Sequence, residues 1–434
     1  MKKKIVRAVG CLVIILALFG GILGVDKFAP EQREIEIIES ISLEQGKKEN
    51  IEYKATGVSK IVNHEPEGAN GLDIKAKSAI LIDASSGKLL YSQNSEEELP
   101  PASVTKIMTM LLILEAVNKG TISLEDEVTI SERAASMGGS QMYMEPGEIH
   151  TLDELMRGIA MVSANDGCVA AAEHLCGTVE IFVEEMNKRA KELGMNNTNF
   201  VNTNGLPAIN HYSSAKDIAI MSRELLKYTS EHDWFTTWQT TIKVGLPGKE
   251  KEFGLTNTNK LIKQYNGANG IKTGFTTDAG YCLAASATRD DMTLIAVVLG
   301  CESSKIRTSE ISRLLDYGFG AYDIVNIADK GQVLGCIDIK QGRDRTLNVV
   351  TQDPIKILVK KGEQDKVTSK LEIKDDIIAP IKKGTELASL VIFIDGVEWG
   401  CYDLLAEKDV EKANFLSLLI RPISDKISDI SQKL

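Results

Sequence analysis

Three short motifs follow one another along this chain, and together they describe a serine acyl-transfer site. They are Ser-Val-Thr-Lys at 103–106, Ser-Ala-Asn at 163–165 and Lys-Thr-Gly at 272–274. A serine hydroxyl is a weak nucleophile until a base takes its proton, and the base here would be a lysine, not a histidine. Because Ser-x-x-Lys occurs three times in the sequence, the inference depends on the setting of the 103–106 copy and on the two motifs downstream.

Ser103 is predicted on the first turn of a buried helix, where the positive end of the helix dipole stabilises negative charge. The apolar residues that follow at helical spacing are Ile107, Met108, Leu111, Leu112 and Leu114. Lys106 lies three residues on, on the same helix face, and its amine can reach the hydroxyl. A free lysine has a pKa of ~10.4, so burial or a nearby positive charge must lower it, and Lys272 is a candidate for that charge.

The other two Ser-x-x-Lys copies have structural interpretations. Ser85 and Lys88 lie between two apolar runs, which predicts a hairpin turn. Ser213 and Lys216 precede an amphipathic run, which predicts a helix cap. Neither copy is expected to do chemistry.

Ser163 and Asn165 are predicted in a short loop between two helices. The serine could relay a proton to a leaving group, and the amide could orient the lysine and hold a substrate carbonyl. Taken alone, the motif is more typical of an ordinary helix cap.

The third motif is predicted on a strand, with further strands at 281–287 and 293–299. Lys272 and Thr273 supply a charge and a hydroxyl suited to a carboxylate. Gly274 lets a substrate backbone lie close to the strand. These residue types indicate a substrate with a free carboxylate at its C-terminus.

Together the motifs resemble those of the penicillin-recognising serine D,D-peptidases, in particular the low-molecular-mass penicillin-binding proteins that act as D-alanyl-D-alanine carboxypeptidases. The matching stretches are residues 99–109, 162–167, 185–187, 193–195, 204–207, 211–217 and 272–276. The resemblance runs from about residue 75 to about residue 405.

The resemblance implies a role for each matching position. Ser103 would be the acylated nucleophile and Lys106 the general base, while Ser163 and Asn165 would assist proton transfer and substrate orientation. The substrate-binding positions would be Lys272, Thr273, Gly274, Phe275 and Thr276. The backbone N–H groups of Ser103 and Phe275 would form the oxyanion hole. The implied reaction removes the terminal D-alanine from a peptidoglycan stem peptide ending in D-Ala-D-Ala, and β-lactam antibiotics would acylate the same serine.

The order of elements predicts an α/β (α+β) fold. Strand signals at 79–83 and 89–92 precede helical runs at 152–161, 168–175, 179–193 and 215–227, and strands after residue 270 and a helix near 309–316 follow. This order suits a sheet covered by helices, and the resemblance implies an antiparallel sheet in a β-lactamase/transpeptidase-like catalytic domain. We expect that domain at 75–320, a charged spacer at 26–74 before it, and a small all-β domain at 321–406 after it.

Both ends of the chain suggest export and contact with a membrane surface. Lys2, Lys3, Lys4 and Arg7 precede an apolar stretch, so residues 1–25 are predicted to be a signal peptide or a membrane anchor, with the body on the extracytoplasmic face of the bacterial membrane. Residues 409–434 carry an apolar stripe at helical spacing. That periodicity fits a docked terminal helix or a coiled-coil seam, while the resemblance favours an amphipathic helix on the membrane surface.

Composition narrows the possible partners. A net charge of −11 and a pI of about 5.2, without a basic stripe, argue against nucleic acid. The five scattered histidines form no metal-spaced cluster, and we expect no metal and no cofactor. Of seven cysteines, Cys168, Cys282 and Cys301 lie in apolar runs and are expected to be buried thiols.

Three alternatives remain beside the carboxypeptidase interpretation. A class A-like β-lactamase adds a glutamate that activates the deacylating water, and Glu192 with Asn196 shows only a superficially similar spacing. Such an enzyme would also not need the β-domain or the C-terminal helix. A non-catalytic wall-binding protein has little support because all the motif residues are present. A D,D-endopeptidase or transpeptidase would use the same site and stays open.

Overall fold

The computed structural model describes residues 72–229, 231–415 and 418. The predicted signal or anchor at 1–25, nearly all of the 26–74 spacer and most of the 409–434 helix lie outside these residues. Within the described part of the chain, every helix is too short or too polar to cross a membrane.

A five-stranded antiparallel sheet forms the centre of the first domain. Its strands lie in the order β2 (Leu89–Gln93), β1 (Ser78–Asp83), β9 (Met292–Cys301), β8 (Gly280–Arg289) and β7 (Ala268–Thr276). Every residue of β1 is buried, with Ile80 and Ile82 in one hydrophobic core and Ala79 and Leu81 in a second one. Since side chains alternate along a strand, both faces of the sheet are covered.

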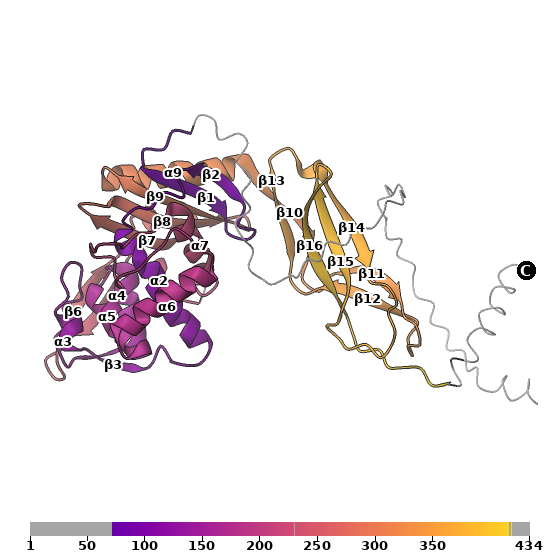
Figure 1. Ribbon diagram of the computed structural model, residues 1–434, viewed down its shortest axis with the longest axis horizontal. Coiled ribbons are helices and arrows are strands. Elements are labelled where there is room, and N and C mark those ends of the chain that lie inside the picture. Colours follow the sequence, from indigo (N-terminus) through magenta and orange to yellow (C-terminus); the bar gives the residue numbers. More distant parts are fainter. Residues whose placement is uncertain (1–71, 230, 416–417, 419–434) are drawn as a thin grey trace, which may run out of the picture. The chain divides into compact units, whose positions relative to one another are not determined.

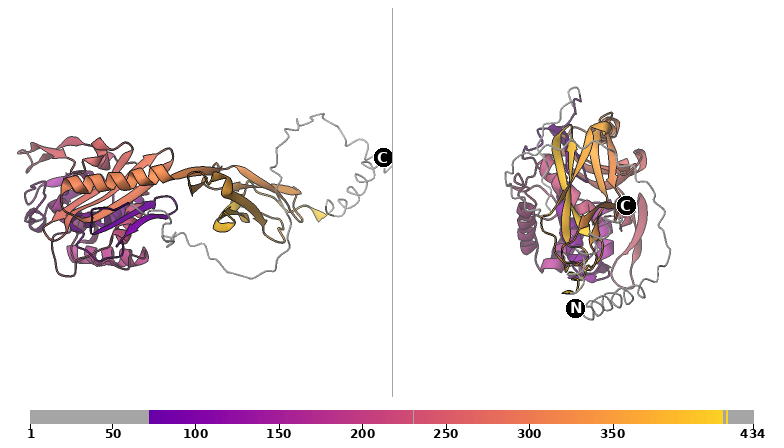
Figure 2. Two further views of the ribbon diagram at one scale, coloured as in Figure 1. Left: turned by 90° about the horizontal axis from the view of Figure 1, so that it is seen from above. Right: turned by 90° about the vertical axis from the view of Figure 1, so that its right-hand side faces the viewer.

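Helices cover the two faces of this sheet (Figures 1 and 2). α9 (Ser304–Ala321) covers one face, where its Leu314 and Leu315 share a core with Leu81 and Leu294. The helices of the other layer are α2 (Lys106–Asn118), α4 (Leu152–Met161), α5 (Asn165–Cys176), α6 (Val179–Glu192) and α7 (Ala215–Leu226). The predicted antiparallel sheet covered by helices is confirmed.

Smaller elements complete this domain. Two hairpins pair β3 (Glu127–Thr129) with β4 (Ile149–Thr151) and β5 (Gln239–Val244) with β6 (Lys251–Thr256). The short helices are α3 (Glu132–Ala135) and α8 (Leu261–Gln264), and the 3-10 turns are η1 (Ala102–Thr105) and η2 (Asp233–Phe235). Of these, η1 matters most for the chemistry, because it contains Ser103.

The second domain is all β, as predicted. β10 (Tyr322–Ala328) pairs with β13 (Ile355–Lys360), and a five-stranded sheet has the order β11 (Val333–Asp338), β12 (Thr346–Thr351), β16 (Val397–Ala406), β15 (Glu386–Ile394) and β14 (Val367–Ile373), with the 3-10 turn η3 (Gln364–Lys366) before β14. Its own core includes Ile337, Val349, Ile357, Ile392 and Leu404.

The beginning of the predicted C-terminal helix is extended in the structure. Val410 forms a β-bridge with Ile381, and Lys412 forms one with Gly342. These bridges tie the first residues of the 409–434 stretch to the β-domain, and the apolar stripe that suggested a helix lies further on.

Local predictions in the first domain compare well with the structure. The turn at Ser85 lies between β1 and β2, and the Ser214 hydroxyl caps α7 by accepting the N–H of Asp217, so both rejected Ser-x-x-Lys copies are structural. α9 begins five residues before the predicted 309, because the Ser303 hydroxyl caps its first turn. Cys168, Cys282 and Cys301 are buried thiols, as expected.

Candidate active site

Ser103 lies on η1 immediately before α2. The preceding residue, Ala102, has a left-handed backbone with φ 49°, which is unusual for a residue with a side chain. On the other side, η1 packs against β7 so closely that a Cβ added to Gly274 would lie 3.1 Å from the Ser103 amide nitrogen. Strained backbone of this kind is concentrated at functional sites, where the surrounding structure holds it in place.

Lys106, the first residue of α2, is completely buried. Its Nζ lies 3.0 Å from Ser103 Oγ, 2.7 Å from Asn165 Oδ1 and 2.6 Å from the carbonyl oxygen of Asn204. Burial lowers the pKa of the Lys106 amine to about 8. Removal of the amine from water therefore makes Lys106 able to act as a base near neutral pH.

Lys272 lies on β7 and is also buried. Its pKa is lowered well below the ordinary value, first by burial and then by the charge of Lys106. Its Nζ donates to the carbonyl oxygen of Thr273 at 3.2 Å. The sequence predicted that burial or a nearby positive charge lowers the pKa of Lys106, and burial is the leading cause for both amines.

The Ser163 and Asn165 motif occupies the predicted loop between α4 and α5. Asn165 is the first residue of α5, and its Nδ2 donates to the Gly138 carbonyl at 2.6 Å while its Oδ1 accepts from Lys106. Ser163 has φ 65°, and its buried hydroxyl finds no hydrogen-bond partner among the described residues. Ser163 lies two residues before Asn165, whose side chain contacts Lys106 directly.

The remaining predicted site residues follow one another at the end of β7. The Thr273 hydroxyl lies 2.8 Å from the hydroxyl of Thr258, which is exposed. Phe275 is 53% exposed and packs against the ring of Tyr281, with the ring centroids 4.3 Å apart. Thr276 Oγ1 accepts the N–H of Ala279 at 3.1 Å. The structure thus places all three motifs around the buried pair of amines.

Sequence reasoning missed several groups that support these residues. Asn204 acts through a backbone carbonyl, which has no residue-type signature. Asp166 is buried behind Asn165 and accepts the N–H groups of Met142 and Gly167 at 2.9 Å each. Its place directly after Asn165 in the matching stretch 162–167 is the signal that could have identified it.

His211 was also missed as a support of η1. Its Nδ1 accepts the N–H of Val201 at 3.0 Å, so the proton of the neutral ring is on Nε2 and is donated to Thr105 Oγ1 at 2.9 Å. Burial lowers the pKa of His211 to about 4, which keeps the ring neutral at physiological pH.

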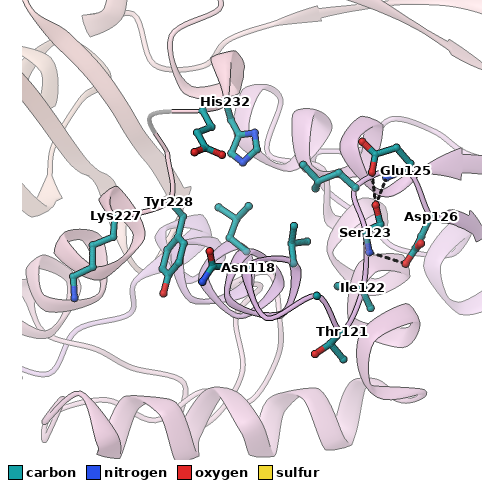
Figure 3. Close-up of a pocket in the computed structure, with 14 residues that line it drawn as sticks. Asn118, Thr121, Ile122, Ser123, Glu125, Asp126, Lys227, Tyr228 and His232 are labelled. Atoms are coloured by element: carbon teal, nitrogen blue, oxygen red, sulfur yellow. Dashed lines mark hydrogen bonds between the residues drawn. The ribbon is translucent and has the colours of Figure 1, made fainter. Parts of the chain in front are cut away.

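Two further observations bear on other kinds of site. The described residues contain no group of three or more His, Cys, Asp and Glu side chains that could hold a metal ion. A pocket of about 640 Å³ lies at the C-terminal end of α2 and is lined by Asn118, Tyr228 and His232 among others (Figure 3). Because α2 has 13 residues and is therefore about 20 Å long, this pocket is remote from Lys106 at the other end of the helix.

Comparison with known proteins agrees with this geometry. Residues 62–303 match the family described as D-alanyl-D-alanine carboxypeptidase, and residues 322–412 match the penicillin-binding protein 5 C-terminal domain. The chain is 46% identical to D-alanyl-D-alanine carboxypeptidase DacF of Bacillus subtilis over 352 residues, 81% of this chain and 90% of that protein. It is 32% identical to DacC of Escherichia coli over 355 residues, 79% of this chain and 86% of that protein.

A solved structure is similar over nearly its whole length. Penicillin binding protein 5 from Haemophilus influenzae aligns with a TM-score of 0.67 and 32% identity, covering 78% of this chain and 98% of that one. The chain belongs to the D-alanyl-D-alanine carboxypeptidase family of serine peptidases. The β-lactamase alternative is therefore set aside.

Proposed function

We propose that Ser103 is the nucleophile with which this chain removes the terminal D-alanine from peptidoglycan stem peptides ending in D-Ala-D-Ala. The observation that carries the proposal is the position of Lys106 Nζ, 3.0 Å from Ser103 Oγ. A base must lie within hydrogen-bond reach of the proton that it takes, and this pair meets that requirement before any substrate is bound.

The other two contacts of Lys106 orient its amine. A neutral lysine amine has two N–H groups and one lone pair. The carbonyl oxygens of Asn165 and Asn204 can only accept, so they take the two N–H groups. The lone pair then faces the Ser103 hydroxyl, and the lowered pKa of about 8 leaves a useful fraction of the amine neutral at physiological pH.

The reaction follows from this arrangement. Lys106 takes the hydroxyl proton of Ser103 as the oxygen attacks the carbonyl carbon of the penultimate D-alanine. The resulting oxyanion would be held by the backbone N–H groups of Ser103 and Phe275. The C–N bond then breaks, and the leaving amine of the terminal D-alanine receives a proton by way of Lys106 and the hydroxyl of Ser163. Water hydrolyses the acyl-enzyme by the same steps and frees Ser103.

Binding of the substrate carboxylate is proposed for Lys272 and Thr273, with Gly274, Phe275 and Thr276 along the strand beside the substrate backbone. Both amines of the site are buried and close enough to repel one another. An anion beside Lys272 would offset that repulsion, which favours a negatively charged substrate end. β-Lactams, which carry a carboxylate and an acylating carbonyl, would react at the same serine.

The place of action and the domain limits are part of the proposal. We assign residues 75–320 to the catalytic domain and 321–406 to the β-domain. Residues 1–25 would export or anchor the chain, 26–74 would form a spacer, and 409–434 would contribute a helix at the outer membrane surface. The substrate lies outside the cytoplasmic membrane, which is why the apolar N-terminal stretch preceded by basic residues supports this assignment.

Intact-mass measurement after incubation with penicillin tests the proposal on the full-length protein in detergent. We expect one covalent adduct on the wild type and none on Ser103→Ala. Ser85→Ala, which changes another Ser-x-x-Lys copy, should keep the adduct. An adduct that persists in Ser103→Ala would refute the assignment of the nucleophile. Release of one D-alanine from a pentapeptide, compared with cleavage of a cross-linked dimer, distinguishes a carboxypeptidase from an endopeptidase.

A further inference from the structure

A pocket of about 360 Å³ lies next to the nucleophile, and Thr276 is the one residue of its wall that the proposed function already uses. It lies between the segment that leads into η1, the loop 205–209 and the residues that follow β7. Ala102, directly before Ser103, is part of its wall, and so is Thr276, directly after Phe275. The loop is held tightly there, since a Cβ on Gly205 would lie 1.8 Å from the Ala102 carbonyl oxygen.

A substrate that lies along β7 would reach this pocket. In the proposed function, the substrate carboxylate lies at Lys272 and Thr273. A strand rises about 3.3 Å per residue, so Thr276 lies about 10 Å from Thr273. An extended peptide covers the same distance in three residues. The residue that precedes D-Ala-D-Ala therefore reaches the level of Thr276, where the pocket opens.

The pocket wall is mostly apolar and contains one carboxylate. Most of the wall is apolar, with Pro101, Leu206 and Ile209 as its larger side chains, and Ile209 is 89% exposed. His211 is the one histidine in the wall, and its low pKa keeps it neutral. Among the described residues that line the pocket, Asp278 is then the one that carries a charge at neutral pH.

Asp278 is exposed at the edge of the pocket, and the described residues offer it no ion pair or hydrogen bond. Exposed carboxylates among the described residues differ in this respect: Glu180, Asp376 and Asp409 are paired with arginine or lysine, whereas Glu97 and Glu98 have no ion pair. What distinguishes Asp278 is therefore its place in the wall of an apolar pocket next to η1. An apolar groove with one unpaired carboxylate at its edge complements a side chain that has an aliphatic stem and an ammonium group at its end.

We propose that this pocket selects the third residue of the stem peptide, and that Asp278 makes it prefer a side chain ending in an amine. The inference rests on the proposed function, because it needs the substrate to lie along β7 with its carboxylate at Lys272. Lysine and a diaminopimelyl residue both supply an ammonium group on an aliphatic stem, the latter with a carboxylate on the same carbon, and the pocket recognises the ammonium group that they share.

Steady-state kinetics of the full-length protein test this with α-blocked peptides of the form X-D-Ala-D-Ala. X is lysine, diaminopimelate or norleucine, the last of which has the aliphatic stem without the amine. We expect kcat/KM for the better of the two amines to exceed that for norleucine about two- to five-fold at low salt, as for a solvent-accessible ion pair, and the ratio to shrink as salt is added. The faster of the two amines identifies the source.

Three variants make the result specific. Asp278→Asn should bring the ratio to about one while norleucine turnover stays at the wild-type value. Asp290→Asn, an exposed aspartate in the turn between β8 and β9, should leave the ratio unchanged. Ile209→Ser should lower kcat/KM for lysine and norleucine peptides alike, because it shortens the apolar wall.

Equal kcat/KM for all three peptides in the wild type would overturn the inference, and so would an amine preference that survives in Asp278→Asn. In both cases norleucine turnover would show that the carboxypeptidase proposal still holds. Failure of that proposal looks different, because no peptide would then release D-alanine and penicillin would leave no adduct.

Discussion

Gly274 on β7 lies directly against the amide nitrogen of Ser103. A Cβ at position 274 would meet that nitrogen, the Pro101 carbonyl oxygen and the Ala102 Cβ, each at 3.1 Å. These neighbours are mainly backbone, so they could make room only by moving η1 by a few tenths of an ångström. β7 and η1 can therefore pack this closely only because residue 274 is a glycine and has no side chain.

Gly274→Ala is therefore expected to damage acylation more than folding. The proposed oxyanion donors, the N–H groups of Ser103 and Phe275, lie on the two sides of this contact. Loss of one such donor costs about 10²- to 10³-fold in rate, so a partial displacement should lower the rate constant of penicillin acylation by about 10- to 100-fold. Stopped-flow acylation and thermal melting check this.

Gly254→Ala is the matched control for that variant. Gly254 lies on β6 with no atom within 4 Å of a Cβ at that position, and alanine there should leave acylation unchanged. If Gly274→Ala acylated at the wild-type rate, the close fit of β7 to η1 would have no part in catalysis.

The buried amine of Lys106 predicts the pH dependence of acylation. Only the neutral amine can take the Ser103 proton, so below a pKa of about 8 the rate should fall tenfold for each pH unit, and above it the rate should level off. Measuring the second-order rate constant for penicillin between pH 6 and pH 10 gives the profile.

Two lysine variants show which amine the profile reports. Lys106→Ala should lose about 10²- to 10⁴-fold in acylation, the range that general-base catalysis contributes. Lys216→Ala changes a lysine of another Ser-x-x-Lys copy, which is paired with Glu96 on the surface, and should keep both rate and profile. A rate that does not vary with pH in the wild type would exclude Lys106 as the base.

Sequence alone predicted the parts of the site that depend on local spacing. Ser103 and Lys106 are three residues apart on one helical turn, so their proximity follows from helix geometry. The loop of Ser163 and the strand of Lys272 follow from the apolar runs around them. The order of elements predicts a sheet covered by helices, whereas the antiparallel arrangement of that sheet came from the family resemblance.

The contacts between distant segments could not be predicted in this way. Lys106 meets Asn165 across 59 residues and the Asn204 carbonyl across 98 residues. The second contact uses a backbone atom that every residue has. The fit of Gly274 to η1 and the unpaired charge of Asp278 likewise depend on how the strand and the loop pack, which spacing within one motif does not determine. The roles assigned to the individual site residues remain predictions.

Thr258 extends the proposed carboxylate site beyond the three motifs. Its hydroxyl lies 2.8 Å from that of Thr273, and it is exposed where Thr273 is buried. Thr258→Val keeps the shape of the side chain and removes this hydrogen bond. We expect KM for a D-Ala-D-Ala peptide to rise about three- to tenfold with little change in kcat, because a neutral hydrogen bond contributes about 1 kcal/mol.

Thr256→Val serves as the control for Thr258→Val, since Thr256 is exposed on β6 and its hydroxyl contacts Gln239 instead. Its kinetic constants should match the wild type. A fall in melting temperature without a change in KM would assign Thr258 a structural role only.

Asp166 is expected to hold the loop that contacts Asn165. Its two carboxylate oxygens accept backbone N–H groups of Met142 and Gly167, while burial raises its pKa above the ordinary value. In Asp166→Asn one carboxylate oxygen is replaced by an NH₂ group. This group is a donor, so it cannot accept the backbone N–H that the oxygen accepted. A buried donor left without an acceptor costs about 1–3 kcal/mol, so the free energy of unfolding in urea should fall by that amount.

The same variant should also slow acylation, because the loop residues Gly138 and Ser140 accept hydrogen bonds from the Asn165 side chain and backbone. If the loop shifts, Asn165 no longer fixes the Lys106 amine. We then expect the acylation rate constant to fall about tenfold when it is measured at a temperature well below the unfolding transition of the variant. Asp353→Asn, at a surface carboxylate that is 75% exposed in the β-domain, should change neither quantity. Unchanged acylation in a destabilised Asp166→Asn protein would show that the loop supports the fold without positioning the base.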